Sequence, residues 1–461
     1  MRSPPTPFGH TRPARLLALA LSALMVLPAH AWSNHALGTW PALAAMAELK
    51  DAAPVTVEPL ETFLAAESTG LIKLLDDEEQ WARQNVPRYA PRPDALAFRP
   101  EGAAPAELVR RFVAAVRINP ASRLALFVQL PPGVAAGGRP TLMESEVTTL
   151  KQTESTKFNT FVALREGDRV PVVDVLATAS DEPDYGLDIG LWVDNGTPYG
   201  QAYGFGKQPF GNPAVEFGSQ GPMHIGYFHE AAIVYKAAPF LERTYPEYRI
   251  HLWQSLAAYA LRSGHPYWGW RFAGWALHYL QDLTQPYHAR VLPDVGVARM
   301  LWINALDLAG FHGAKERAVT FVTNRHLALE NYQLRWLRDA HTRHDASDAA
   351  LRALGDTSRD AQTGYRPDSP RRVITSESSA LADALDELLV AQLPAKVTSD
   401  PSYVFGVTET GLDLYAQTAR LDPAARQGMT RAIAPLLANF GTHTRAFVRT
   451  LIADARLTPA R

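Results

Sequence analysis

The sequence predicts an all-α protein. Apolar residues recur with a period near 3.6 over six long segments, a spacing that places them on one face of a helix. Strand signals are few, and the best of them is RLALFVQL at 123–130. The chain has 461 residues, of which 47% are hydrophobic and 20% charged, as in ordinary globular proteins. We therefore expect a folded, mainly helical chain rather than a disordered one.

The expected helical segments are distributed along the chain. They are residues 36–50, 106–118, 250–285, 298–338, 378–393 and 410–454. Between them lie stretches rich in turn-forming residues, at 85–105, 131–140, 195–213 and 355–372. None of these stretches is a long low-complexity linker, and we found no internal repeat. We therefore expect a single helical domain over 32–461 with long loop insertions, in which residues of about 85–150 could form a small appendage.

The N-terminus has the pattern of a secretory signal peptide. Two arginines precede an apolar run at 16–27, and the sequence AHA at 29–31 fits an A-x-A cleavage site. The apolar run is shorter than the ~20 residues that a membrane-spanning helix needs. We expect cleavage after Ala31, so that the mature protein begins at Trp32 and is secreted or periplasmic.

Charge and cysteine content narrow the function classes. The formal net charge is -2 and there is no long run of Lys and Arg, so the chain lacks the basic surface with which many proteins track a nucleic-acid backbone. There are no cysteines. An exported protein of this composition has no disulfide support, and its core or a bound metal must stabilise it.

The stretch ALHYLQDLTQPYHAR at 276–290 carries the strongest site signal. His278 and Asp282 are four residues apart, which places them on one face of a helix. Pro286 then disturbs the helix, and His288 follows at a turn that can bring it back to the same pocket. The preceding residues are so aromatic that burial is expected, and burial of a carboxylate is costly unless it is paired or binds a metal. This pattern favours a metal site.

A second His and carboxylate pair lies further along the chain. His326 and Glu330 in NRHLALENY are again four apart, and two such pairs on packed helices could present ligands to one cavity. However, FHGAKE offers His312 and Glu316 at the same spacing. Spacing alone therefore leaves both pairs open.

These residues carry a resemblance to a known family. HYLQDLTQPYHA is similar to the H-Y-L-x-D-x-x-Q-P-x-H-A signature of the zinc-dependent phospholipase C family, which shares a superfamily with fungal and plant single-strand nucleases. In that superfamily the mature chain begins with a tryptophan whose amino group and carbonyl bind zinc, and Trp32 follows the expected cleavage site. The resemblance implies an all-helical fold that holds three zinc ions.

The resemblance also implies roles for the residues of the motif. His278 and Asp282 match two metal ligands, the aspartate bridging two ions, and His288 matches the histidine of a different zinc. The partners of that third ion are an H-x-x-x-E pair. His326 and Glu330 fit this pair better than the alternative at 312 and 316, because the sequence ENY resembles the continuation E-N-aromatic of the family.

Two further ligands are implied upstream, an aspartate and then a histidine. Asp181 is followed by Glu and Pro as in the family, and Asp184 is the second choice. For the histidine, GPMHIGYFHE offers His224 and His229, and we prefer His224 because a short hydrophobic and aromatic run follows it.

His35 is the implied partner of Trp32 on the third zinc. Relatives usually place more residues between the terminal Trp and this histidine, so the sequence departs from the family pattern here. The span from His35 to Asp181 is also longer than in the compact phospholipases. The resemblance is strong over about 265–335 and extends to 32–35 and 178–230.

The implied ligand set suits phosphoryl chemistry. His and carboxylate ligands suit zinc, and three zinc ions beside the charges of Asp181, Asp282 and Glu330 leave a positive site for an anionic phosphoryl group. Bound zinc lowers the pKa of its water to ~7, which supplies a nucleophile at neutral pH. By this interpretation Asp181 could also orient or deprotonate that water.

Three functions compete. We prefer a phospholipase C that cleaves glycerophospholipids such as phosphatidylcholine to diacylglycerol and a phosphorylated headgroup, with transient contact to a membrane surface. Glu330 favours it, because the related nucleases usually carry Asp there, and so does the lack of cysteines. The alternatives are a single-strand nuclease or nucleotidase, with nucleic acid as the substrate, and a non-catalytic helical protein that zinc stabilises. No stable protein partner is evident.

Overall fold

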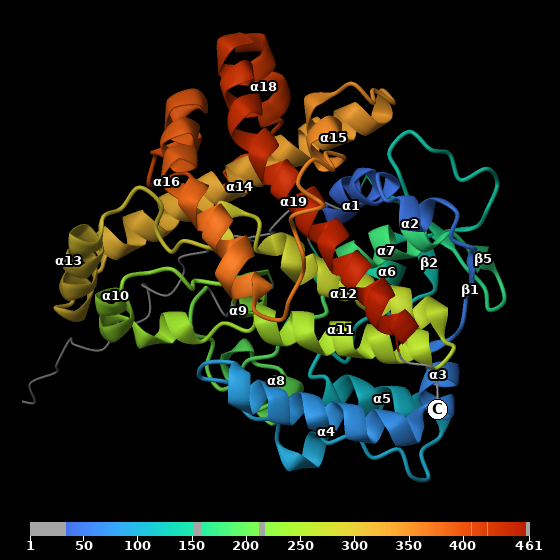
Figure 1. Ribbon diagram of the computed structural model, residues 1–461. Coiled ribbons are helices and arrows are strands. Elements are labelled where there is room, and N and C mark those ends of the chain that lie inside the picture. The colour runs from blue at the N-terminus through green and yellow to red at the C-terminus, as the bar shows by residue number, and fades with distance from the viewer. Residues whose placement is uncertain are drawn as a thin grey trace, which may run out of the picture.

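The computed structural model describes residues 34–151, 156, 158–211, 217–406, 408–421 and 423–457. The expected signal peptide and Trp32 lie outside these residues. Helix accounts for 61% and strand for 4% of the structure, so the prediction of a mainly helical protein is confirmed (Figure 1). Among the described helices, none has an apolar stretch of membrane-spanning length.

The described residues form nineteen α-helices. These are α1 (His35–Ala44), α2 (Ala47–Lys50), α3 (Leu60–Ala66), α4 (Ser68–Asn85), α5 (Pro105–Ala115), α6 (Glu144–Val147), α7 (Val172–Asp181), α8 (Pro198–Ala202), α9 (Gly221–His224), α10 (Ala232–Ala237), α11 (Pro246–Arg262), α12 (Pro266–Asp282), α13 (Val297–Leu308), α14 (Gly313–Thr342), α15 (Ala349–Leu354), α16 (Thr375–Gln392), α17 (Ala395–Thr398), α18 (Leu414–Leu421) and α19 (Pro423–Leu457).

Short turns of other helix types connect these elements. The 3-10 turns are η1 (Asp94–Leu96), η2 (Glu182–Tyr185), η3 (Val193–Asn195), η4 (Phe217–Ser219), η5 (Pro239–Glu242) and η6 (Pro286–His288), and η7 (Pro370–Ile374) is a π-helical turn. η2 and η6 end helical segments at a proline, which cannot donate a backbone hydrogen bond and so favours a change of direction. Both turns carry residues of the candidate site.

Five short strands form two small antiparallel sheets. They are β1 (Val55–Thr56), β2 (Phe127–Leu130), β3 (Thr141–Leu142), β4 (Thr160–Ala163) and β5 (Arg169–Val170). β1 pairs with β5, and the other sheet has the order β2-β4-β3, with Phe127 opposite Ala163. The expected strand at 123–130 thus forms in its second half.

Four of the expected helical segments contain two helices each, and one of them is 410–454, which contains α18 and α19. The segment 250–285 contains α11 and α12, separated at Gly264, and the segment 298–338 contains α13 and α14, separated near Gly310. These glycines have φ of +90° and +89°, a backbone conformation that side chains disfavour and glycine adopts readily. In the same way, 36–50 contains α1 and α2. Periodicity located the helical residues but not these breaks.

Two helices of ten or more residues, α4 and α7, were not predicted. α4 buries Leu71, Leu75 and Ala82 at helical spacing, but its many charged and amide residues obscure that pattern. α7 buries eight of its ten residues, from Val172 to Asp181, and it is shorter than the windows of about 11–18 residues in which a helical period is recognised. It is the helix that leads into the candidate site.

The largest core cluster lies around α11 and α12, which run side by side through the middle of the molecule (Figure 1). Trp268, Phe272 and Trp275 of α12 are fully buried in it, as the aromatic sequence indicates. Phe98 and Phe112, from the region considered as an appendage, belong to the same cluster.

α7 packs closely against α12. A Cβ atom at Gly274 would lie 2.4 Å from the Cβ of Ala179, closer than packed atoms approach. Glycine at 274 therefore allows the two backbones to approach. This contact places the end of α7 beside the site residues of α12, and α1 packs against both α7 and α19.

Candidate metal centre

The structure brings eight of the predicted or alternative ligands into three buried groups, in each of which the potential ligand atoms lie within 4.8 Å of one another. The first two groups share His278, and we refer to them together as the inner cluster. The third is the outer cluster. The groups are His35, Asp184 and His278; His224, His278 and Asp282; and His288, His326 and Glu330.

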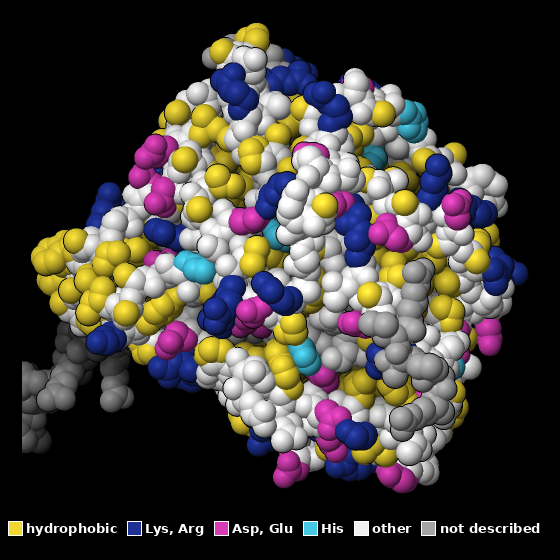
Figure 2. Space-filling view, in the orientation of Figure 1, with side chains coloured by type: hydrophobic (Ala, Val, Ile, Leu, Met, Phe, Trp, Pro, Cys, Tyr) yellow, Lys and Arg dark blue, Asp and Glu magenta, His cyan; other side chains and the backbone are white. Residues whose placement is uncertain are grey.

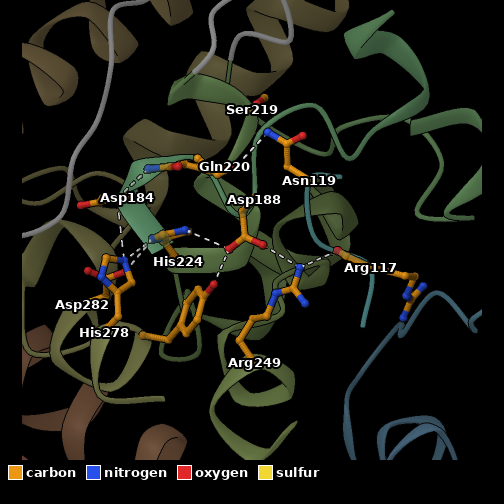
Figure 3. Close-up of polar contacts among 12 residues, drawn as sticks. Arg117, Asn119, Asp184, Asp188, Ser219, Gln220, His224, Arg249, His278 and Asp282 are labelled. Carbon is orange, nitrogen blue, oxygen red and sulfur yellow. Dashed lines mark hydrogen bonds and ion pairs between the residues drawn. The ribbon is translucent and has the colours of Figure 1, made fainter. Parts of the chain in front are cut away.

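Asp282 occupies the middle of the inner cluster. Its Oδ1 lies 3.2 Å from Nε2 of His35, and its Oδ2 lies 2.8 Å from Nδ1 of His224 and 3.5 Å from Nε2 of His278. The two oxygens therefore face different histidines (Figure 3 shows the side of His224 and His278). A carboxylate in this arrangement can bridge two cations.

The histidines of the inner cluster are oriented by buried acceptors. Nδ1 of His278 lies 2.7 Å from the carbonyl oxygen of Ser180, which can only accept, so this nitrogen carries the proton and Nε2 faces the cluster. Nδ1 of His35 donates to Oε1 of Gln281 at 2.9 Å. The amide of Gln281 is fixed in turn, because its Nε2 donates to Thr39 and Thr444. A fixed tautomer of this kind is typical of metal-binding histidines.

Asp188 holds His224 in the same way. Its Oδ2 lies 3.2 Å from Nε2 of His224 and accepts a hydrogen bond of 2.6 Å from the hydroxyl of Tyr279. Its Oδ1 accepts a hydrogen bond of 2.6 Å from Arg249 (Figure 3). Burial raises the pKa of Asp188, but the Arg249 and His224 interactions outweigh it and hold the pKa below its usual value. Sequence reasoning missed Asp188 because no local motif marks it.

Protonation differs between the inner histidines. Burial and the neighbouring His35 lower the pKa of His278 to about 3, so its ring is neutral at pH 7 and can offer a lone pair. For His224, burial lowers the pKa, but hydrogen bonds with Asp188 and Asp282 raise it to about 10. In the absence of a metal, a proton on His224 thus offsets part of the negative charge of Asp188 and Asp282.

Three buried atoms at this centre have no hydrogen-bond partner among the described residues. They are Nε2 of His288 and the facing atoms Nε2 of His35 and Oδ1 of Asp282, which form an ion pair at 3.2 Å without hydrogen-bond geometry. Buried polar atoms are normally hydrogen-bonded, so a cluster of such atoms calls for an explanation. A metal ion satisfies a histidine nitrogen and a carboxylate oxygen that face each other. The donor set therefore fits a metal.

The outer cluster is carried by η6 and α14. Nε2 of His326 lies 2.8 Å from Oε1 of Glu330, one turn further along α14. The ring of His288 lies edge-on to that of His326, with 5.0 Å between centroids, and the ring of Tyr287 stacks on that of His326 at 5.4 Å. Nδ1 of His288 donates to the carbonyl oxygen of His224 at 3.0 Å, which directs its Nε2 away from that bond. This contact also links the two clusters.

The structure places the two aspartate candidates differently. Asp184 belongs to the inner cluster, with its Oδ1 3.7 Å from Nε2 of His278. Asp181 belongs to none of the three groups of described residues. Its carboxylate accepts hydrogen bonds from the backbone N–H of Ala36 and from the side chain of Gln129, and burial raises its pKa to about 6. It therefore holds the start of α1, next to His35.

The remaining alternatives lie apart from the clusters. His229 shares a hydrogen bond of 2.9 Å with the hydroxyl of Thr375. His312 is exposed and pairs with Asp307 at 2.7 Å. Neither residue, nor Glu316, belongs to the three groups of described residues.

Comparison of the chain with protein-family models, with curated proteins and with solved structures found no match in any of the three. The resemblance to the zinc-dependent phospholipase C family therefore stays a prediction from the motif. What the structure gives independently is a set of buried His, Asp and Glu clusters that could hold metal ions.

Proposed function

We propose that this protein is a metal-dependent phosphodiester hydrolase, with zinc as the metal and a glycerophospholipid as the substrate. The observation that carries the proposal is the orientation of four buried histidines. Each places one ring nitrogen against a buried acceptor and turns the other nitrogen toward a cluster. For His35 and His224 the acceptors are the side chains of Gln281 and Asp188, respectively. For His278 and His288 they are the carbonyl oxygens of Ser180 and His224, respectively. Outer partners of this kind fix metal ligands in place.

The ligand types favour zinc. The clusters offer imidazole nitrogens and carboxylate oxygens without sulfur, a set that zinc accepts in catalytic sites. Asp184, Asp282 and Glu330 supply three negative charges, fewer than the charges of two or three divalent ions. The loaded site would therefore be positive and would attract an anionic phosphodiester. The neutral His278 needs no deprotonation before it binds a metal.

The chemistry follows from these residues. When bound, zinc ions supply a water of pKa ~7 and positive charge for the phosphoryl oxygens. Asp282 and Asp184 hold the inner side of the site, and Glu330 with His326 holds the side that borders a cavity. The contacts of Asp181 support a positioning role through Ala36 and His35, and the proton-accepting role considered for it stays a prediction.

The test is a pair of assays on the purified full chain after export. We expect hydrolysis of phosphatidylcholine that a chelator abolishes and zinc restores, together with bound zinc measured by mass spectrometry. Absence of tightly bound metal would contradict the proposal. Chelator-sensitive cleavage of single-stranded DNA without lipid turnover would instead favour the nuclease alternative.

A matched pair of variants locates the activity. His326→Ala and His312→Ala remove histidines that have the same spacing to a glutamate, but only His326 belongs to a cluster, whereas His312 is exposed. We expect His326→Ala to lose at least about a hundredfold in kcat/KM, as when an essential electrostatic group is removed. His312→Ala should retain the activity of the unmodified protein, and equal losses in both would speak against the assignment.

A further inference from the structure

A cavity of about 570 Å³ lies beside the outer cluster, between α10, η5, α13 and α14. Its volume falls in the range of about 300 to 1,000 Å³ that is usual for small-molecule sites. Most of its lining is aliphatic or aromatic, including Val234, Leu241, Met300, Ile303 and Val319. The cavity thus suits an apolar ligand rather than a sugar or a base, whose polar groups would lose hydrogen bonds there.

The cavity extends to the candidate metal centre. His326 forms part of its wall, and so does Tyr287, whose ring stacks on His326. A ligand whose phosphate lies beside His326 would therefore have this apolar cavity next to it. Lys315 is the one charged residue of the described lining, and it is paired with Asp307 at 2.7 Å. The combination is complementary to a molecule with an anionic head and an uncharged, apolar tail.

Helix α13 is apolar on both of its faces. Met300 and Ile303 line the cavity, whereas Trp302 and Leu308 face the solvent with exposed fractions of 64% and 80%. Phe311, just after the helix, is 67% exposed. Figure 2 shows hydrophobic side chains gathered at the left margin, where Figure 1 places α13. Large exposed apolar patches of this kind mark contact sites, and an apolar helix face can lie at the boundary of a lipid surface.

From these features we infer that the cavity binds a hydrocarbon chain of the lipid substrate, while the outer face of α13 rests on the lipid surface from which that chain enters. The inference rests on the proposed function in one respect, namely that the bound chain belongs to a phospholipid that is hydrolysed at the metal centre. The cavity itself and the exposed patch are independent of the metal, so each part can be tested separately.

The first test fills the cavity. Ala318 lines it from α14, and the preceding residue, Arg317, is exposed and does not line it. Ala318→Trp should retain hydrolysis of a diacyl phosphatidylcholine with four carbons per chain. It should lose at least about tenfold in kcat/KM for one with eight carbons, because each buried CH₂ group contributes roughly a fourfold change in affinity. Arg317→Trp should behave like the unmodified protein toward both substrates.

A binding measurement separates this inference from the proposed function. cis-Parinaric acid, a chain probe that fluoresces in apolar cavities, should bind the unmodified protein and Arg317→Trp but not Ala318→Trp, with or without a chelator. Binding of the probe in a protein that hydrolyses no phosphodiester would uphold the chain site and overturn the proposed function. No binding to the unmodified protein, or equal binding to both tryptophan variants, would overturn the chain site.

The second test concerns the surface of α13, where substitutions leave the core intact. The triple variant Trp302→Ser, Leu308→Ser and Phe311→Ser should lose most of the sedimentation with phosphatidylcholine vesicles and retain cleavage of the four-carbon substrate. Met143→Ser is the control, since Met143 is 68% exposed on a different part of the chain. Vesicle binding that is unchanged in the triple variant would overturn the role of α13.

Discussion

The inner and outer clusters use similar residues but are held in different ways. In the inner cluster, ligand side chains come from α1, η2, α9 and α12, and a layer of buried partners such as Asp188 and Gln281 fixes them. The outer cluster comes from one turn and one helix, and it borders an apolar cavity. The difference suggests a division of work, in which the inner cluster sets the geometry of the metal centre and the outer cluster meets the substrate.

The largest expected effect comes from Asp282. Asp282→Asn removes the charge shared by His35, His224 and His278, so we expect a loss of about a hundredfold to a thousandfold in kcat/KM and of metal from the inner cluster. Glu330→Gln should remove metal from the outer cluster only. Metal content per chain, measured on both variants, checks the comparison.

The control for this pair is Glu316→Gln, because Glu316 has the same spacing to a histidine as Glu330 but lies outside the clusters. It should retain all metal. If Asp282→Asn and Glu330→Gln each lost the whole metal content, the two clusters would be a single cooperative site and the division of work would be wrong.

The next effect concerns the support of the inner cluster. Asp188→Asn keeps the shape of the side chain but weakens its hold on His224, so metal affinity should fall by about tenfold to a hundredfold. A chelator competition titration measures this fall. Asp386→Asn is the matched control, since Asp386 is also a buried aspartate that binds a tyrosine and an arginine, Tyr287 and Arg325.

The control variant Asp386→Asn should lower the free energy of unfolding without changing the affinity of the inner cluster for metal. A fall in that affinity as large as the one in Asp188→Asn would show that any buried aspartate has this effect, and that Asp188 has no particular part in holding His224.

The smallest effect is a pH-dependent one at α19. Asp360 binds Arg445 at 2.8 Å, and burial raises its pKa, but hydrogen bonds from Arg445 and Arg449 outweigh burial and lower it. Its stabilising contribution is therefore present above the unfolded pKa of about 4 and is lost as the pH falls through the lower folded value. Asp360→Asn should reduce the free energy of unfolding by about 2 kcal/mol at pH 7, as for a hydrogen bond to a charged group.

Urea unfolding at a series of pH values checks this prediction. The difference between the variant and the unmodified protein should shrink below about pH 4. Because Arg445 follows Thr444, which holds Gln281, a weakened α19 should loosen the inner cluster before the outer one. A difference that stays constant down to pH 2 would contradict the role of the Asp360 charge.

Local spacing marks His278 with Asp282 and His326 with Glu330 as candidate pairs, but it marks the pair at 312 and 316 equally, and the resemblance of ENY to the family pattern was needed to choose between the last two pairs. His326 and Glu330 lie one helical turn apart, and so do His278 and Asp282, so a helix alone places each pair on one face. Asp181 and Asp184 could not be separated in this way. They stand where α7 passes into η2, and only the change of helix type decides which carboxylate faces the clusters.

The supporting residues could not be predicted at all. Asp188 meets Arg249 across 61 positions of the chain, and Gln281 meets Thr444 across 163, so no local pattern marks either contact. The same holds for the cavity, which forms between four elements whose relative placement follows from packing. The helix breaks at Gly264 and Gly310 were visible only as single glycines within periodic segments.

The close approach of α7 and α12 at Gly274 has a consequence for how the centre can vary. Gly274 is one turn before His278 on α12, and it touches Ala179, the neighbour of the Ser180 carbonyl that accepts from His278. Any side chain at 274 would act as a spacer between the two helices and would pull that acceptor away from the imidazole. The position of the His278 imidazole relative to the Ser180 carbonyl is therefore set by Gly274, which has no side chain and takes no part in the chemistry.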